Sequence, residues 1–181
     1  TFTKRVSVDL VVGASASTGT GALEQFEFEE LARLKTKILA AKEEGFEYID
    51  FEGQASWKHP DIRELIHCAR EQGLGVRQVV RESGAGLGEV RQSIGQLIDC
   101  GVIDFDLHIA RDDPGLWPVL AELAARKFQC ALTLFVDGKS LHLIQRLQRE
   151  DLGAVYLLNV DFDLRGLEFN LSSLCSPLLA L

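Results

Sequence analysis

The chain has 181 residues, of which 46% are hydrophobic and 25% charged, with a formal net charge of −8 at pH 7 and a pI of about 5.0. This acidic balance argues against binding to nucleic acid or to anionic membranes, which depends on basic patches. No apolar run is long enough to predict a membrane span, and no signal-peptide pattern is found. We therefore expect a cytoplasmic protein with a single domain over residues 1–181, a length that supports a sizeable core.

The four cysteines, Cys68, Cys100, Cys130 and Cys175, are widely separated, and no two of them form a CxxC pair. Zinc knuckles and iron–sulfur clusters need thiolates at short, regular spacings. The pattern therefore predicts reduced, largely buried thiols and no metal site made of these residues.

Six strand patterns alternate along the chain with five helical patterns. The predicted strands cover residues 5–12, 46–52, 76–82, 102–109, 130–137 and 154–162. Apolar residues at intervals of three or four predict helices over 31–38, 62–69, 90–98, 116–124 and 141–147. Gly45, Gly73 and Gly101 each stand between a helix and the next strand, where a left-handed helix end favours glycine. This rhythm predicts a parallel sheet with crossover helices.

The strands alternate polar and apolar residues, which separates a barrel from a flat sheet covered on both faces. In 102–109, Asp104, Asp106 and His108 alternate with Ile103, Phe105, Leu107 and Ile109. A parallel sheet with helices on both faces needs strands that are apolar throughout. The alternation instead predicts an α/β fold of the (βα)6 partial TIM-like barrel type, with outer helices and a polar inner face that is open at one side.

The stretch DFEGQASWKHPDI, residues 50–62, carries a resemblance to a known family. Phe51, Gly53, His59, Pro60 and Asp61 are in register with the pattern FxGGEPxxHPD, which follows the second strand in many radical S-adenosylmethionine proteins. The chain thus resembles a member of that superfamily, whose core is a (βα)6 partial barrel. The resemblance covers about residues 5–165, and only the register of 51–61 is distinctive.

The departures from the family pattern fall on its chemistry. The first-strand loop, 13–26, contains no cysteine, whereas the family places a CxxxCxxC cluster motif there. Gln54, Ala55 and Ser56 replace the GEP residues, and Ala55 stands where the family's glutamate holds the cofactor's amino group. A methyl group cannot accept that hydrogen bond. Gly53, Gln54, Ala55 and Ser56 are therefore degenerate cofactor-binding positions, and we expect neither a cluster nor any other cofactor.

Polar residues at the carboxyl ends of the strands form a candidate site. Glu52, His108, Asp137 and Asp161 lie at or near the ends of the second, fourth, fifth and sixth predicted strands, where barrel enzymes place their catalytic groups. Together they could supply a base and an acid or bind a divalent metal. Alternatively, they are ordinary solvated charges at strand ends.

Further residues have candidate roles in binding or in positioning the fold. Arg77 and Arg81 could pair with the inner-face acids, which we favour, or bind a ligand carboxylate. Arg81 and Asp106 are candidate binding residues. Trp57 is a third, either as a lid over the barrel mouth or as a contact for a partner. His59 lies in a helix-start sequence and is expected to position the helix rather than to react. The glycine-rich segment 14–21 lacks the GK[ST] of a P-loop and is interpreted as a relic of the cluster loop.

The sequence favours a non-catalytic radical-SAM-like domain, a pseudoenzyme that binds or scaffolds a protein or peptide partner and can form a homo-oligomer. The alternative is a barrel lyase, aldolase or isomerase that uses acid–base or metal-binding residues at the strand ends. A third possibility is a sensor that holds a small polar ligand inside the barrel. Enzymatic activity is thus left open, with the missing cluster cysteines weighing against it.

Overall fold

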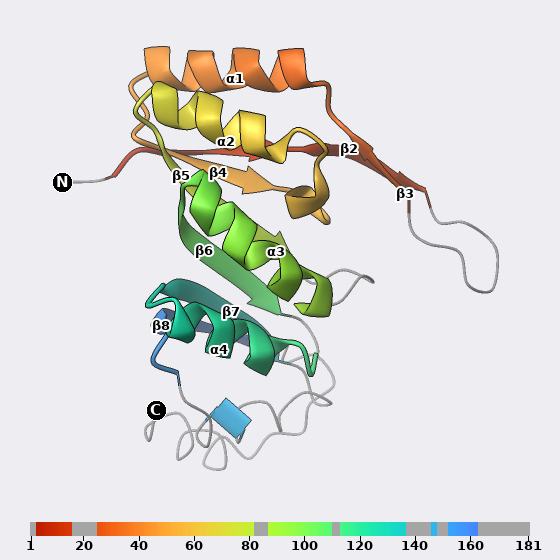
Figure 1. The fold of residues 1–181 in the computed structure, drawn as a ribbon, viewed down its shortest axis with the longest axis vertical. Coiled ribbons are helices and arrows are strands. Elements are labelled where there is room, and N and C mark those ends of the chain that lie inside the picture. Colours follow the sequence, from red (N-terminus) through yellow and green to blue (C-terminus); the bar gives the residue numbers. More distant parts are fainter. Residues whose placement is uncertain are drawn as a thin grey trace.

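The structure is a computed structural model that describes residues 3–15, 25–81, 87–109, 113–136, 146–147 and 152–162. A six-stranded parallel sheet forms its centre, and a two-stranded antiparallel hairpin projects from one end (Figure 1). The sheet strands are β1 (Arg5–Asp9), β4 (Tyr48–Glu52), β5 (Gly75–Arg81), β6 (Val102–Ile109), β7 (Cys130–Val136) and β8 (Val155–Phe162).

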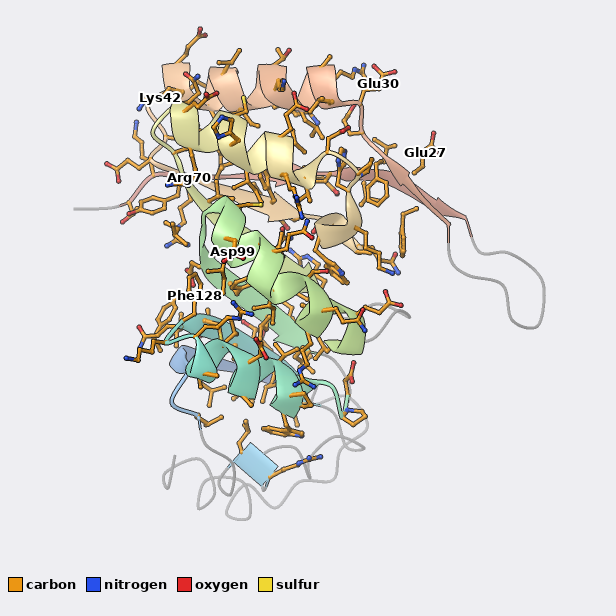
Figure 2. All side chains as sticks on the ribbon, viewed as in Figure 1. Glu27, Glu30, Lys42, Arg70, Asp99 and Phe128 are labelled. Atoms are coloured by element: carbon orange, nitrogen blue, oxygen red, sulfur yellow. The ribbon has the colours of Figure 1, made fainter. Side chains whose placement is uncertain are left out.

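Helices connect consecutive strands of the sheet from β1 to β7. They are α1 (Leu31–Glu43), α2 (Ile62–Glu71), α3 (Leu87–Cys100) and α4 (Leu116–Ala125), with a short 3₁₀ turn, η1 (Ser56–Lys58), before α2. Their outer sides carry charged side chains, including Lys42, Arg70 and Asp99 (Figure 2). In the described residues, no helix is both long and apolar enough to cross a membrane.

The strand order β1-β4-β5-β6-β7-β8 follows the order of the chain. Parallel crossovers are right-handed, so successive connections in one direction place their helices on the same side of the sheet. Figure 1 shows α1 to α4 along one side. Within the described residues β1 and β8 are the two edges and do not pair with each other. The predicted fold class is confirmed as α/β with a parallel sheet and outer helices, in the open arrangement of a partial barrel.

The core lies between the sheet and these helices. Phe51, Phe105 and Leu107 point from the strands toward the helices and are fully buried, as are Leu34 and Ile38 on α1. Burial of a large apolar side chain contributes roughly 1.5–3 kcal/mol, so this layer is the main source of stability.

The glycines at the helix ends have the predicted conformation. Gly45, Gly73 and Gly101 have φ values of +78°, +73° and +108°, which side chains with a Cβ atom rarely adopt. Each follows the end of a helix by one or two residues. Successive glycines are 28 residues apart (45 to 73 and 73 to 101), so this spacing marks successive helix–strand junctions.

The prediction of a single strand over 5–12 and a loop over 13–26 is wrong in part. The first strand ends at Asp9, whose Oδ1 accepts a hydrogen bond from Val11 N at 2.9 Å. Leu10 is fully buried, and the chain then enters β2 (Val11–Ser15), which pairs with β3 (Gln25–Phe28). Because residues 13–26 were predicted as one loop, the pairing of β2 with β3 was missed.

The alternation in β6 also has one exception that the sequence missed. The β5–β6 register shifts between Val76 and Arg77, whose partners are Val102 and Asp104. Ile103 therefore has no partner on β5 and is 50% exposed instead of facing the helices. A register shift depends on the neighbouring strand, which the periodicity of β6 alone does not contain.

Candidate functional site

The face of the sheet opposite the helices, called here the concave face, carries most of the polar strand residues. Side chains of alternating strand positions point to it, as the polar–apolar pattern predicts. The charged groups of β4, β5 and β6 that form ion pairs or hydrogen bonds on this face are Asp50, Glu52, Arg77, Arg81, Asp104, Asp106 and His108.

Arg77 lies at the centre of this face and binds two carboxylates. Its Nε and Nη2 donate to the Asp50 carboxylate at 3.0 and 2.5 Å, and its Nη1 lies 3.0 Å from Asp106 Oδ2. Asp50 is only 4% exposed, so this forked contact replaces its hydration. Burial alone lowers the pKa of Arg77, but Asp50 and Asp106 outweigh it and raise that pKa above its ordinary value. The predicted internal ion-pair network is present.

Arg81 and Glu52 form a second, more exposed pair toward the carboxyl ends of β5 and β4. Arg81 Nη2 donates to Glu52 Oε2 at 2.6 Å, with the Arg81 side chain 51% exposed. Burial alone raises the pKa of Glu52, but hydrogen bonds from Ser7 and Arg81 and the Arg81 charge together lower it. Glu52 is therefore an ionised, compensated carboxylate rather than a proton donor.

Asp106 and His108 form the third element of the concave face. His108 Nε2 lies 3.2 Å from Asp106 Oδ1, and the His108 ring is 6.2 Å from the ring of Phe135 on β7. Burial alone raises the pKa of Asp106, but His108, Arg77 and Arg81 outweigh it and lower the pKa. His108 Nδ1 is buried and has no hydrogen-bond partner among the described residues.

The structure thus brings four of the predicted site residues together: Glu52, Arg81, Asp106 and His108. Asp161 lies on β8 in register with Phe135, one strand beyond the ring that contacts His108. Asp137 lies outside the described residues. Across the described ranges, no group of three or more His, Cys, Asp or Glu side chains is arranged to hold a metal ion.

The segment between β4 and η1 holds the degenerate cofactor positions. Gly53 has φ +110°, and Ala55 is fully buried with φ +55°. Gln54 is partly buried, and Ser56 is fully buried with its Oγ 2.7 Å from Gln78 Nε2 on β5. Two of the four side chains therefore pack inside the protein, and a bound ligand could not reach them without a rearrangement.

His59 has both ring nitrogens engaged. Its Nδ1 accepts from Asp61 N at 3.0 Å, and its Nε2 lies 3.0 Å from the carbonyl oxygen of Glu29. Because Nδ1 accepts, the proton lies on Nε2, which donates to that carbonyl. The Phe28 ring packs edge-on against the imidazole at 5.1 Å. His59 joins the end of the hairpin to the start of α2, which supports the predicted positioning role.

Trp57 was predicted as a lid or partner contact, but its side chain is 4% exposed and belongs to the core. Its position just before the HPD residues gave no information on burial. A role of Trp57 in binding stays a prediction, with no exposed surface to support it.

Burial raises the pKa of two of the described thiols, those of Cys68 and Cys130. Cys68 is on α2, and burial raises its pKa. Cys130 begins β7, is fully buried, and burial with the nearby Asp104 and Asp106 charges raises its pKa to about 12. Cys100 is partly buried, and Cys175 lies outside the described residues. A thiol ligand must lose its proton, so burial works against metal binding at Cys68 and Cys130.

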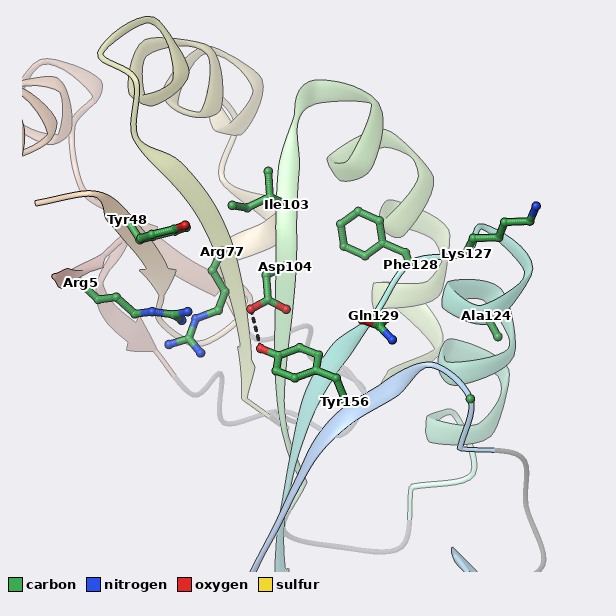
Figure 3. A pocket seen from close by; sticks show the side chains of 11 residues that line it. Arg5, Tyr48, Arg77, Ile103, Asp104, Ala124, Lys127, Phe128, Gln129 and Tyr156 are labelled. Carbon is green, nitrogen blue, oxygen red and sulfur yellow. Dashed lines mark hydrogen bonds between the residues drawn. The ribbon is translucent and has the colours of Figure 1, made fainter. Parts of the chain in front are cut away.

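A cavity that the sequence patterns did not predict lies toward the amino ends of the strands. It has a volume of about 810 Å³ (Figure 3). The side chains that shape it include Arg5, Tyr48, Ile103, Asp104, Phe128 and Tyr156. Asp104 belongs to the predicted polar face, but Ile103 and Phe128 gave no signal because a register shift and a helix–strand connection bring them there.

Comparison with known proteins adds no relative. The chain matches no protein-family model, and no curated protein is similar enough to it to count as a match.

Proposed function

We propose that this chain is a degenerate, radical-SAM-like partial barrel that no longer supports cluster or cofactor chemistry and acts as a non-catalytic binding or scaffolding module for a protein or peptide. The observation that carries this proposal is the concave face, which none of the described helices covers and where a charged network lies beside exposed apolar side chains. Glu52 and Arg81 neutralise each other, while Phe135 and Leu157 are 40% and 47% exposed. Polar rims around apolar contacts are typical of protein interfaces.

Two features support the loss of cofactor chemistry. Residues 13–26 contain no cysteine, and burial raises the pKa of the Cys68 and Cys130 thiols. Ala55 and Ser56, at the positions of the family's cofactor-binding residues, are fully buried.

Anaerobic reconstitution with iron and sulfide tests this part of the proposal. We expect no charge-transfer absorbance of a 4Fe–4S cluster and no stoichiometric iron after desalting. A stoichiometric cluster in the desalted protein would contradict the proposal.

Partner binding is tested by co-purification from the native source with two matched variants. Leu157→Lys introduces a charge on the concave face, and Leu39→Lys introduces the same charge on the outer side of α1, where Leu39 is 45% exposed. We expect a stoichiometric partner with the unmodified chain and with Leu39→Lys, and at least a tenfold loss with Leu157→Lys. Equal retention by both variants would show that the concave face is not the docking surface.

One observation favours the alternative of an acid–base enzyme, namely that Nδ1 of His108, beside the Asp106–Arg77 pair, has no hydrogen-bond partner among the described residues. An imidazole held by a carboxylate on one side and free on the other can exchange a proton with a substrate. If this alternative holds, His108→Ala abolishes turnover of the substrate and Glu52→Gln reduces it, and both variants remain folded. Activity that persists in His108→Ala would exclude it.

A further inference from the structure

The cavity toward the amino ends of the strands lies away from the β4–η1 loop and from the Glu52–Arg81 pair, and it forms a site of its own. Its volume of about 810 Å³ falls within the range of about 300–1,000 Å³ that is usual for small-molecule sites. Gly75 makes room for two of its walls, since a Cβ atom at this residue would lie 2.6 Å from the Tyr48 ring and 2.7 Å from Ile103 Cδ1. The cavity therefore depends on a glycine at this point of β5.

Asp104 is the carboxylate of this cavity, and the protein compensates its charge incompletely. Its Oδ2 accepts a hydrogen bond from Tyr156 at 2.7 Å, and no cationic side chain of the described residues lies within ion-pair distance. Burial raises the pKa of Asp104 above its ordinary value, against the hydrogen bond from Tyr156 and the more distant charges of Arg77 and Arg5. A carboxylate that has lost hydration without gaining an ion pair has capacity for a cation.

The cations around the cavity do not fill that need. Arg77 already binds two carboxylates, Asp50 and Asp106. The Arg5 guanidinium lies 5.3 Å from the centre of the Tyr48 ring and is exposed to solvent. Lys127 is exposed and points away from Asp104 (Figure 3). Exposed cations keep their hydration, whereas the half-buried Asp104 does not, so the less satisfied charge in the cavity is negative.

The remaining walls suit the body of such a ligand. Tyr48, Phe128 and Tyr156 present aromatic rings to the cavity, and Ile103 adds an aliphatic surface. Aromatic faces attract ammonium groups and also bury apolar carbon. We infer that this cavity binds a small primary amine with an aromatic or apolar body, its ammonium group on Asp104. This inference does not rest on the proposed function.

Titration of the full chain with benzylamine, followed by NMR or calorimetry at constant ionic strength, tests the inference. Benzyl alcohol serves as the neutral probe and benzoate as the acidic one. We expect benzylamine to bind with one site and each of the other two probes at least tenfold more weakly, because a hydrogen bond to a charged group contributes a roughly 10- to 100-fold gain. No binding of benzylamine, or tighter binding of benzoate, would overturn the inference.

Two matched substitutions locate the site. Asp104→Asn removes the carboxylate and keeps an acceptor for Tyr156, so we expect benzylamine affinity to fall by about tenfold or more. Asp99→Asn removes one charge from the exposed outer side of α3 and is expected to leave affinity unchanged. Circular dichroism confirms folding of both variants. Equal affinities of Asp104→Asn and Asp99→Asn would contradict the assignment.

Discussion

The helix-covered face and the concave face of the sheet carry different side chains, although the same strands build both. On the covered face, Phe105 and Leu107 are fully buried against the helices. On the concave face, Asp106 of the same strand pairs with Arg77 on β5, Asp104 accepts a hydrogen bond from Tyr156 on β8, and His108 lies beside Asp106. The two faces of one sheet therefore differ in role: the covered face supplies most of the apolar burial that stabilises the fold, and the concave face carries the polar groups that could bind a ligand or partner.

The largest expected effect compares one phenylalanine from each face. Phe105→Ala removes a fully buried ring on the covered face and should cost about 3–5 kcal/mol of unfolding free energy. Phe135→Ala, from the concave face of the adjacent strand, removes a ring that is 40% exposed and should cost less than about 1.5 kcal/mol. Urea denaturation measures both, and similar losses would contradict the division of the two faces.

The next comparison is between the two arginines of the concave face. Arg77→Met leaves the buried Asp50 without its partner and should cost about 3 kcal/mol. Arg81→Met breaks a pair whose arginine is half exposed, so we expect a loss of about 1 kcal/mol or less. Equal losses in urea denaturation would show that burial does not determine the strength of these pairs.

Gly53, directly after β4, allows a close approach of the backbone to Asp9, and a substitution there tests this approach. A Cβ atom there would lie 2.4 Å from Asp9 Oδ1, and φ is +110°, so Gly53→Ala should cost about 2–3 kcal/mol. Gly45→Ala is the control, because its φ is +78° but nothing lies within 4 Å, and it should cost about 1 kcal/mol. A Gly53→Ala variant as stable as Gly45→Ala would exclude the close approach to Asp9.

The smallest effect separates two acids of the concave face. The pKa of Asp106 lies below its ordinary value of 3.8 and that of Asp104 above it. A lowered pKa gives stability that is present above the ordinary value and is lost as the pH falls through the folded-state pKa. A raised pKa gives stability that is complete below the ordinary value and is lost as the pH rises through the folded-state pKa.

At neutral pH we therefore expect Asp106→Asn to destabilise the protein and Asp104→Asn to stabilise it slightly. Both differences should shrink in acid, once the two carboxylates of the unmodified chain are protonated. Thermal unfolding from pH 3 to pH 7 checks this. If Asp104→Asn lost as much stability at neutral pH as Asp106→Asn, the conclusion that the protein compensates the Asp104 charge incompletely would be wrong.

The sequence predicted much of the fold because local patterns reflect which face of an element is buried. The alternation in β6 and the apolar stripes of the helices gave the strand order of a partial barrel, and Gly45, Gly73 and Gly101 marked the helix ends. Glu52 and His108 were predicted to share one edge because parallel strands bring their carboxyl ends together, and they lie beside Arg81 and Asp106, which were predicted separately as binding residues. The resemblance to radical S-adenosylmethionine proteins stays a prediction.

What only the tertiary structure decided depends on contacts between elements distant in the chain. Trp57 is buried because η1 packs into the core, and Ile103 turns outward because β5 and β6 shift register. The cavity around Asp104 exists because β1, β4, β6 and β8 bring their amino ends together over Gly75. Periodicity along one strand indicates which face of the sheet a residue occupies. Which groups form ion pairs, and which charged groups lose hydration, depends on contacts between strands that only the tertiary structure provides.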